Sequence, residues 1–210
     1  MTIKTGKFIT LEGGEGVGKT TNLSFIKDYL QNKNIDLIVT REPGGTQLAE
    51  QIRALLLQSN NEAVTASTEL LLMFAARAQH LNNLIKPALN EGKWVLCDRF
   101  TDATYAYQGG GRGMSLETIN WLETFVQGEL RPDLTLLLDA PVETGMARAK
   151  NRGGQLDRFE LEQLDFFNKV RQTYLFLAKN SPNRIKIIKA DQPLIAVQNA
   201  IAGALHPLLS

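Results

Sequence analysis

The feature that most constrains the fold of this chain is the segment Gly-Gly-Glu-Gly-Val-Gly-Lys-Thr at residues 13–20, which follows a strand-like apolar run at residues 8–11. Glycine, four residues and then Gly-Lys-Thr is the pattern of a loop that binds phosphates between a strand and a helix. The glycines let successive N–H groups face the phosphates, and the helix adds its positive N-terminal end. We expect nucleoside triphosphate binding through Gly13, Gly14, Glu15, Gly16, Val17, Gly18, Lys19, Thr20 and Thr21.

Two side chains of this phosphate loop have predicted roles. Lys19 places a positive charge near the β- and γ-phosphates, and the Thr20 hydroxyl joins the coordination of Mg²⁺. The alternative is a Gly-rich turn with an incidental lysine. The strand before the loop and the amphipathic helix after it favour the nucleotide site.

Composition limits the partners. The chain has 210 residues and a net charge of +1, which argues for one domain and against a nucleic-acid groove or a basic membrane surface. The longest apolar run, residues 70–76, is far shorter than the roughly 18 residues of a membrane span. The single cysteine, Cys97, lies in an apolar run and is predicted to be buried rather than reactive. We therefore expect a cytoplasmic protein with small partners.

Strand-like and helix-like segments alternate, which predicts an α/β fold with a parallel sheet. The strands are expected at residues 7–12, 37–41, 94–98, 134–139 and 185–190. Ligands of open parallel sheets bind beyond the carboxyl ends of the strands, so Glu12, Arg41, Asp98 and Asp139 are predicted to lie along one rim.

The helices that follow cover the sheet, and no repeat or linker divides the chain into two domains. Apolar spacing predicts helical segments at residues 23–30, 48–56, 67–90, 116–126, 142–150, 159–177 and 194–208. Two Gly-rich stretches, residues 108–113 and 152–155, are expected to be loops.

Two classes of phosphate-loop protein compete at this point. A GTPase switch reads guanine with Asn-Lys-x-Asp after a later strand, but no Asn-Lys pair in this chain has Asp in that place, and Asn32-Lys33 is followed by Asn34 and Ile35. A small-molecule kinase needs a second anionic pocket and cations for the transferring group. The chain has candidates for both, so the kinase is favoured.

The end of the third strand supplies the candidate acceptor pocket. Asp98 is placed near Mg²⁺, and Arg99 has a planar fork of donors that suits a phosphate. Arg41 and Arg53 are further candidate phosphate cations, and Pro43 begins a turn at the same rim. A surface ion pair for Arg99 and a solvated side chain for Arg53 are the alternatives.

A lid is predicted at about residues 148–160. Arg148, Lys150, Arg152 and Arg158 surround the pair Gly153-Gly154, so the glycines allow closure and the cations arrive when the lid closes. The alternative is a charged helix end with surface ion pairs.

A base pocket is predicted on the long helix. Phe74 and Arg77 are three residues apart and share a face, so Phe74 is expected to stack on a base and Arg77 to donate to its exocyclic oxygen. Phe74 taken alone is more often a core residue, and its pairing with Arg77 is what favours the base pocket.

Six segments in this order resemble the thymidylate kinase family: the phosphate loop, residues 41–46, 74–80, 98–100, 104–113 and 156–160. The resemblance covers nearly the whole chain. It implies a phosphate-loop kinase fold with five parallel strands and a short lid, in a single domain of residues 1–210, and a homodimer formed through helices. It also implies transfer of the γ-phosphoryl group of ATP to dTMP with Mg²⁺, in dTTP synthesis.

The resemblance also implies residue roles. Thr104 and Gln108 would contact the base region, Tyr107 would lie against C2′ of the sugar, and Glu15 would approach the sugar or the acceptor phosphate. Arg99 would hold that phosphate with Arg41 or Arg53, and Asp98 would hold Mg²⁺ directly or through water. Lys19 and Arg152, with Arg148 and Lys150 behind them, would neutralise the transferring group.

Two departures from the family pattern are Phe100, where Tyr or His is common, and Lys150, where an arginine is expected. The remaining alternatives are a kinase for another nucleoside monophosphate or for a deoxynucleoside, and a protein that senses nucleotide without transfer.

Overall fold

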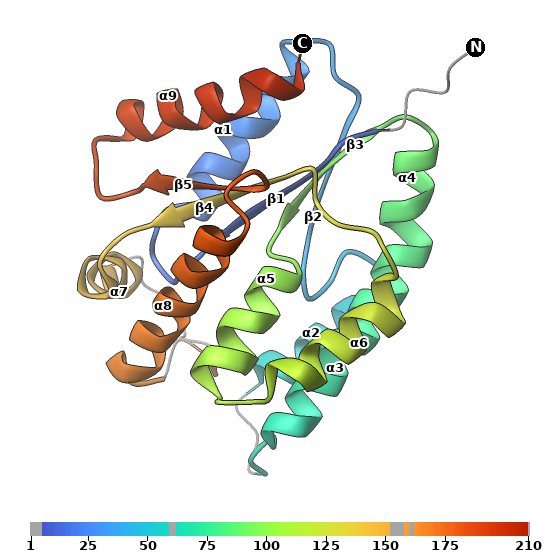
Figure 1. The fold of residues 1–210 in the computed structure, drawn as a ribbon, viewed down its shortest axis with the longest axis vertical. Coiled ribbons are helices and arrows are strands. Elements are labelled where there is room, and N and C mark those ends of the chain that lie inside the picture. Colours follow the sequence, from blue (N-terminus) through green and yellow to red (C-terminus); the bar gives the residue numbers. More distant parts are fainter. Residues whose placement is uncertain (1–5, 59–61, 152–157, 160–161, 210) are drawn as a thin grey trace.

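A five-stranded parallel sheet is the centre of the protein in a computed structural model, which describes residues 6–58, 62–151, 158–159 and 162–209 (Figure 1). The spatial order is β2-β3-β1-β4-β5. Its strands are β1 (Phe8–Gly13), β2 (Leu37–Arg41), β3 (Trp94–Asp98), β4 (Leu134–Asp139) and β5 (Ile185–Lys189). The α/β class and all five predicted strands are thereby confirmed, with ends that agree to within one residue.

The register brings the carboxyl ends of the central strands together. Leu11 of β1 is the partner of Asp98 in β3, and Arg41 of β2 is also paired with Asp98. Because β1 lies between β3 and β4, the phosphate loop leaves the middle of the sheet. Residues that follow the neighbouring strands therefore surround the loop.

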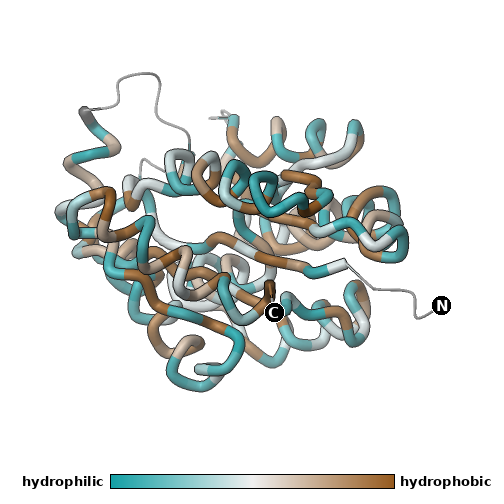
Figure 2. Tube along the Cα trace, turned by 90° about the horizontal axis from the view of Figure 1, so that it is seen from above, coloured by the Kyte–Doolittle hydropathy of each residue, from teal (hydrophilic) through white to brown (hydrophobic). Residues whose placement is uncertain are grey.

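Helices cover both faces of the sheet (Figure 1). On one face, α1 (Lys19–Gln31) and α9 (Leu194–Leu205) pack on alternate residues of the strands. The other face is covered by α4 (Lys86–Asn90), α5 (Thr101–Thr104) and α8 (Leu164–Asn180). The central strands β1, β3 and β4 are largely apolar because they are buried on both sides, and brown segments run through the centre of Figure 2.

Four further helices lie around the carboxyl edge or in an outer layer: α2 (Gln47–Leu57), α3 (Ala66–His80), α6 (Leu116–Gln127) and α7 (Val142–Asn151). Helix α3 packs between α2 and α6. No helix within the described ranges is long and apolar enough to cross a lipid bilayer. Cys97 is fully buried in the core, and burial raises the pKa of its thiol well above the usual value, so the prediction of a buried cysteine is confirmed.

Three segments differ from the prediction. The helix expected at residues 67–90 consists of α3, a π-helical turn η1 (Leu81–Ile85) and α4. The helix expected to begin at residue 159 begins at Leu164. The stretch expected to be a loop at residues 108–113 lies largely in the π-helical segment η2 (Tyr105–Gly111), which continues α5.

Close packing explains the glycines of η2. A Cβ atom on Gly110 would collide with the side chain of Thr173, and one on Gly111 with the ring of Phe166. Both neighbours are on α8. The glycines therefore let two helical segments approach each other, a role that a Gly-rich sequence does not distinguish from a flexible loop.

Candidate active site

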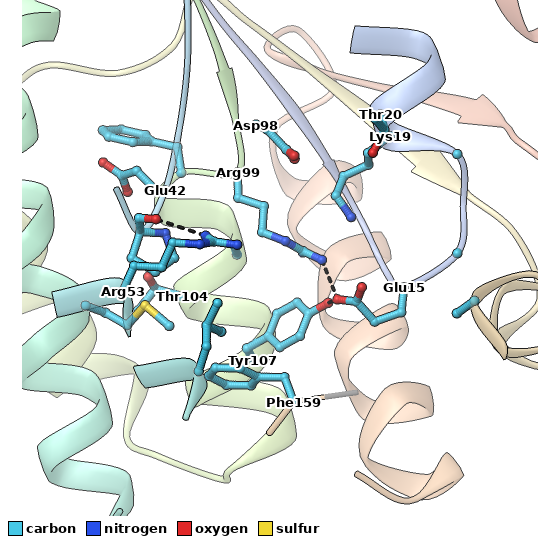
Figure 3. Close-up of a pocket in the computed structure, with 18 of the residues that line it drawn as sticks. Glu15, Lys19, Thr20, Glu42, Arg53, Asp98, Arg99, Thr104, Tyr107 and Phe159 are labelled. Carbon is cyan, nitrogen blue, oxygen red and sulfur yellow. Dashed lines mark hydrogen bonds and ion pairs between the residues drawn. The ribbon is translucent and has the colours of Figure 1, made fainter. Parts of the chain in front are cut away.

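A cavity of about 500 Å³ opens at the carboxyl edge of the sheet, between the phosphate loop, β3 and η2 (Figure 3). This volume is typical of a small-molecule site. Fourteen of the residues predicted from the sequence line it: Glu15, Gly16, Gly18, Lys19, Thr20, Thr21, Pro43, Arg53, Asp98, Arg99, Thr104, Tyr107, Gln108 and Arg148.

The phosphate loop is held in its shape by glycine backbone angles and a close contact. Gly16 and Gly18 have φ angles of +67° and +92°, in the region that favours glycine. A Cβ on Gly16 would also collide with the carbonyl oxygen of Gly145 in α7. The tight loop leaves Lys19 at the start of α1, where its ammonium donates to the carbonyl oxygen of Gly14 at 3.1 Å.

Lys19 has both positively and negatively charged neighbours. Desolvation lowers its pKa, and the neighbouring Arg99 lowers it further, whereas Glu15 and Asp98 oppose the shift. A bound phosphate would stabilise the charged form of Lys19, because its negative charge offsets both the desolvation and the repulsion from Arg99.

Arg99 reaches the phosphate loop from the end of β3 (Figure 3). Its backbone is left-handed, with φ of 66°. The guanidinium donates to the carbonyl oxygen of Gly13 at 2.9 Å and to the carboxylate of Glu15 at 2.6 Å. Its Cζ lies 4.7 Å from the centre of the Tyr107 ring, whose hydroxyl donates to the same carboxylate at 2.8 Å.

Glu12 holds the backbone bend at residues 99–100, directly after β3, which places Arg99 at the cavity. One of its carboxylate oxygens accepts from the N–H of Phe100 at 2.7 Å, and the other accepts from the hydroxyl of Tyr174 at 2.7 Å. Arg99 donates to the same hydroxyl at 3.3 Å. Burial, followed by the nearby Asp102, raises the pKa of Glu12 to about 8. The sequence placed Glu12 at this rim but carried no signal of its contact with the bend after β3.

Asp98 and Thr20 are suited to a hydrated cation. One carboxylate oxygen of Asp98 is buried and has no hydrogen-bond partner, although buried polar atoms are normally paired. Thr20, which also lines the cavity, is exposed. Within the described ranges no group of three or more His, Cys, Asp or Glu side chains gathers to bind a metal. This set fits Mg²⁺, which binds through few protein oxygens together with waters and phosphates.

Arg77 lies behind the cavity as one member of a buried polar cluster. It donates to Glu42 at 2.7 Å and to the hydroxyl of Thr104 at 2.9 Å, and it is 2% exposed. His80 contacts the other oxygen of Glu42 at 3.1 Å. The Nη1 atom of Arg77 is buried without a hydrogen-bond partner. An orphaned donor beside a cavity suggests a ligand acceptor.

Phe74 does not line the cavity, contrary to the arrangement expected from the sequence. Its ring is 2% exposed and packs in a cluster with Leu70, Ile119 and Leu122. The preceding residue, Met73, lines the cavity instead. Met73 and Phe74 both lie within one helical turn of Arg77, so helical spacing alone could not predict which of them faces the cavity. Phe74 is on the side of α3 that packs against α6, and it is therefore a core residue.

The remaining predicted cations differ in position. Arg41 is exposed and pairs with Glu50 at 2.9 Å, outside the cavity lining, which corrects its expected place beside the acceptor. Arg53 lines the cavity and donates to the carbonyl oxygen of Pro43 at 2.9 Å (Figure 3). Arg148 lines it from α7, Lys150 is exposed, and Arg152 lies outside the described residues.

Comparison with known proteins decides the family. The family model for thymidylate kinase matches residues 11–201. The chain belongs to the thymidylate kinase family. It is 60% identical to the thymidylate kinase of Pseudomonas entomophila, over 98% of this chain and 97% of that protein. It is 58% identical to that of Teredinibacter turnerae, over 98% of this chain and all of that protein.

A solved structure agrees with the sequence relatives. The crystal structure of thymidylate kinase from Ehrlichia chaffeensis superposes with a TM-score of 0.77 and 33% identity, covering 96% of this chain and 99% of that one. The resemblance inferred from six segments is confirmed. The protein is a nucleoside monophosphate kinase that phosphorylates dTMP with ATP in dTTP synthesis.

Proposed function

We propose that the cavity at the carboxyl edge of the sheet carries out this transfer with Mg²⁺, with ATP on the phosphate loop and dTMP beside β3 and η2. One observation carries the proposal: Lys19 and Arg99 reach the same cavity from two elements, and the buried Asp98 oxygen lies at the end of one of them. Two phosphate-binding groups around one space are what transfer between two nucleotides requires.

The donor half consists of the phosphate loop, residues 13–21. Its N–H groups and the start of α1 bind the triphosphate, and Lys19 approaches the phosphoryl group that moves. Thr20 and Asp98 would hold Mg²⁺. When bound, that ion withdraws charge from the phosphate oxygens.

The acceptor half is built around Arg99, with Arg53 as a second cation and Glu15 beside both the phosphate and the sugar. The acceptor phosphate is already an anion, so no strong base is needed. One of its oxygens forms a bond to the γ-phosphorus, the bond from that phosphorus to the β–γ bridging oxygen breaks, and ADP leaves with the electron pair. Arg148 and Arg152 neutralise charge on the transferring group.

The base lies against Met73 and Arg77 in this proposal, and no longer against Phe74. Met73 is an unbranched apolar side chain that lines the cavity. The unpartnered Nη1 atom of Arg77 has the right chemistry for a base carbonyl. Thr104 and Gln108 line the same part, and Tyr107 stands against C2′ of the sugar.

A homodimer of single-domain chains of residues 1–210, working in the cytoplasm, completes the proposal. Trp121 and Phe125 on α6 are 63% and 75% exposed, and their rings stack with centroids 5.5 Å apart. Such an aromatic pair on a helix face is suited to a two-fold contact with its own copy. The unpaired Cys97 thiol matches a reducing compartment.

The test is ADP release from Mg·ATP with a panel of acceptors: dTMP, dUMP, UMP, dCMP, dAMP, dGMP and thymidine. We expect dTMP to be preferred. The kcat/KM for dUMP should be lower by only about 10- to 200-fold, because the two bases differ by one methyl group. Preference for another acceptor would overturn the base pocket. Transfer that persists when Mg²⁺ is removed with EDTA would contradict the proposed metal site.

A further inference from the structure

Glu69 is a buried carboxylate that does not line the cavity but contacts a residue that does. It lies in the first turn of α3, and its side chain is 1% exposed. Its oxygen accepts from the Nε2 atom of Gln108 at 2.7 Å. Gln108, in η2, is itself 1% exposed and forms part of the cavity wall.

Two arginines bind the same carboxylate. Arg158 donates to it at 2.6 Å, and Arg112 donates through two nitrogens at 3.3 Å each. Arg112 also pairs with Glu162 at 2.5 Å. Two cations and two carboxylates therefore balance in this cluster. Both oxygens of this carboxylate therefore accept hydrogen bonds from guanidinium groups.

This arrangement determines the orientation of the Gln108 amide. An amide presents two N–H donors on one side and an oxygen acceptor on the other. Because Glu69 only accepts, the NH₂ group must face it. Within the described part of the chain, no residue donates to the amide oxygen of Gln108. The oxygen is therefore the atom that remains for a ligand.

One donor behind the cavity and one acceptor in its wall then remain without a protein partner. The donor is the unpartnered Nη1 atom of Arg77, and the acceptor is the Gln108 oxygen. Thr104 connects the two, because it accepts from Arg77 at 2.9 Å and lies one helical turn before Gln108. Thymine offers a carbonyl oxygen next to a ring N–H, which matches this pair. Cytosine offers an amino group next to a bare ring nitrogen, which mismatches both.

We propose that Glu69 is a positioning residue that holds the Gln108 amide with its oxygen toward the acceptor base, and thereby excludes cytosine nucleotides. The inference rests on the proposed function, in which the base lies against Arg77 and Gln108. Sites built on paired hydrogen bonds reject mismatched ligands by about 10⁴-fold or more, because a mismatch leaves buried polar groups unpaired.

The experiment compares kcat/KM for dTMP with kcat/KM for dCMP. In Glu69→Gln, the new amide can either donate or accept a hydrogen bond. The Gln108 amide is then free to flip, so that its NH₂ group faces the base. We expect the dTMP-to-dCMP ratio to fall by about 10- to 100-fold, while the KM for ATP stays within about twofold. Arg112→Gln is the matched control, since it removes an ion pair of the same carboxylate but keeps the contact with Gln108. Its ratio should remain that of the wild type.

A double-mutant cycle with Gln108→Leu separates this inference from the proposed function. Gln108→Leu should lower the ratio, and adding Glu69→Gln to it should lower the ratio no further. If Gln108→Leu leaves the ratio unchanged, the base assignment itself is wrong. If Gln108→Leu lowers the ratio but Glu69→Gln does not, or the two effects add in full, the role of Glu69 is overturned.

Loss of Glu69 leaves Arg158 without its carboxylate, which can destabilise the fold. If circular dichroism shows that Glu69→Gln is unfolded, the same ratio is measured in Glu69→Gln/Arg158→Gln, which lacks the uncompensated cation. We expect the same fall of about 10- to 100-fold in that variant. A wild-type ratio there would overturn the proposal.

Discussion

The guanidinium of Arg99 and the carboxylate of Glu15 form a 2.6 Å ion pair that joins the end of β3 to the phosphate loop. Both side chains are 17% exposed, so the pair faces the cavity without being sealed from it. Tyr107 donates to the same carboxylate. One carboxylate thus holds two residues of the proposed acceptor site, and the chemistry of that site depends on how Arg99 is placed.

Replacement of Arg99 should remove phosphate binding on the acceptor side. We expect Arg99→Ala to lower kcat/KM for dTMP by on the order of 100-fold, and Arg99→Lys to lower it less, because lysine keeps the charge but loses the planar fork. Steady-state kinetics and calorimetric titration with dTMP measure this. Near-normal turnover in Arg99→Ala would contradict the assigned role.

Replacement of Lys19 should affect the donor side instead. Lys19→Ala is expected to lower kcat by on the order of 100-fold, since a cation at the transferring group stabilises charge in the transition state. Its dissociation constant for dTMP should stay within about twofold of the wild type, unlike that of Arg99→Ala. Loss of dTMP binding in Lys19→Ala would show that the two phosphate sites are not separate.

Met73 and Phe74 should differ in what their replacement changes. Met73→Ala removes apolar surface from the cavity wall and should raise the KM for dTMP by about 10-fold, with little change in unfolding temperature. Phe74→Leu should instead lower the free energy of unfolding by about 1–2 kcal/mol and leave the KM nearly unchanged, because its ring is in the core. The reverse pattern would restore Phe74 as the residue against the base.

Glu12 should make stability depend on pH. Its pKa of about 8 in the folded protein exceeds the ordinary 4.5, so between these values the folded state keeps a proton that the unfolded state has lost. The free energy of unfolding therefore decreases as pH rises from about 4.5 through about 8, by up to roughly 1.4 kcal/mol per pH unit from this group. The contribution is fully present below pH 4.5.

Urea unfolding at several pH values measures this slope. Glu12→Gln should flatten it across the window, whereas the exposed Glu91→Gln should not. An identical slope in the wild type and Glu12→Gln would exclude Glu12 as its source. A slope of opposite sign that disappears in Glu12→Gln would show that Arg99 stabilises the ionised carboxylate more than burial disfavours it.

The stacked pair on α6 should control assembly. Phe125→Glu places a charge on the proposed two-fold contact and should shift the protein from dimer to monomer in sedimentation velocity runs at micromolar concentration. Ile195→Glu is the control, because it puts the same charge on an equally apolar exposed site of α9, where Ile195 is 66% exposed. If the wild-type protein sediments as a monomer, the proposed homodimer is wrong.

Most of the fold could be predicted from the sequence because its signals are local. Short segments rich in branched apolar residues mark the strands, and the phosphate loop marks the turn after β1. The helical character of η2 could not be predicted, since its glycines serve contacts with Thr173 and Phe166, which are more than fifty residues away. Local propensity does not report contacts at that distance.

The site divides in the same way. The sequence by itself predicted the chemistry, because Asp98 and Arg99 stand at the end of one strand and Lys19 begins the helix after another, and a parallel sheet brings both places to one edge. Only the tertiary structure decided which face of α3 meets the cavity, where Met73 and not Phe74 is a lining residue. It also decided that Glu12 holds the bend at Arg99 and that Glu69 orients Gln108. Such contacts depend on packing between distant elements, whose geometry no local pattern contains.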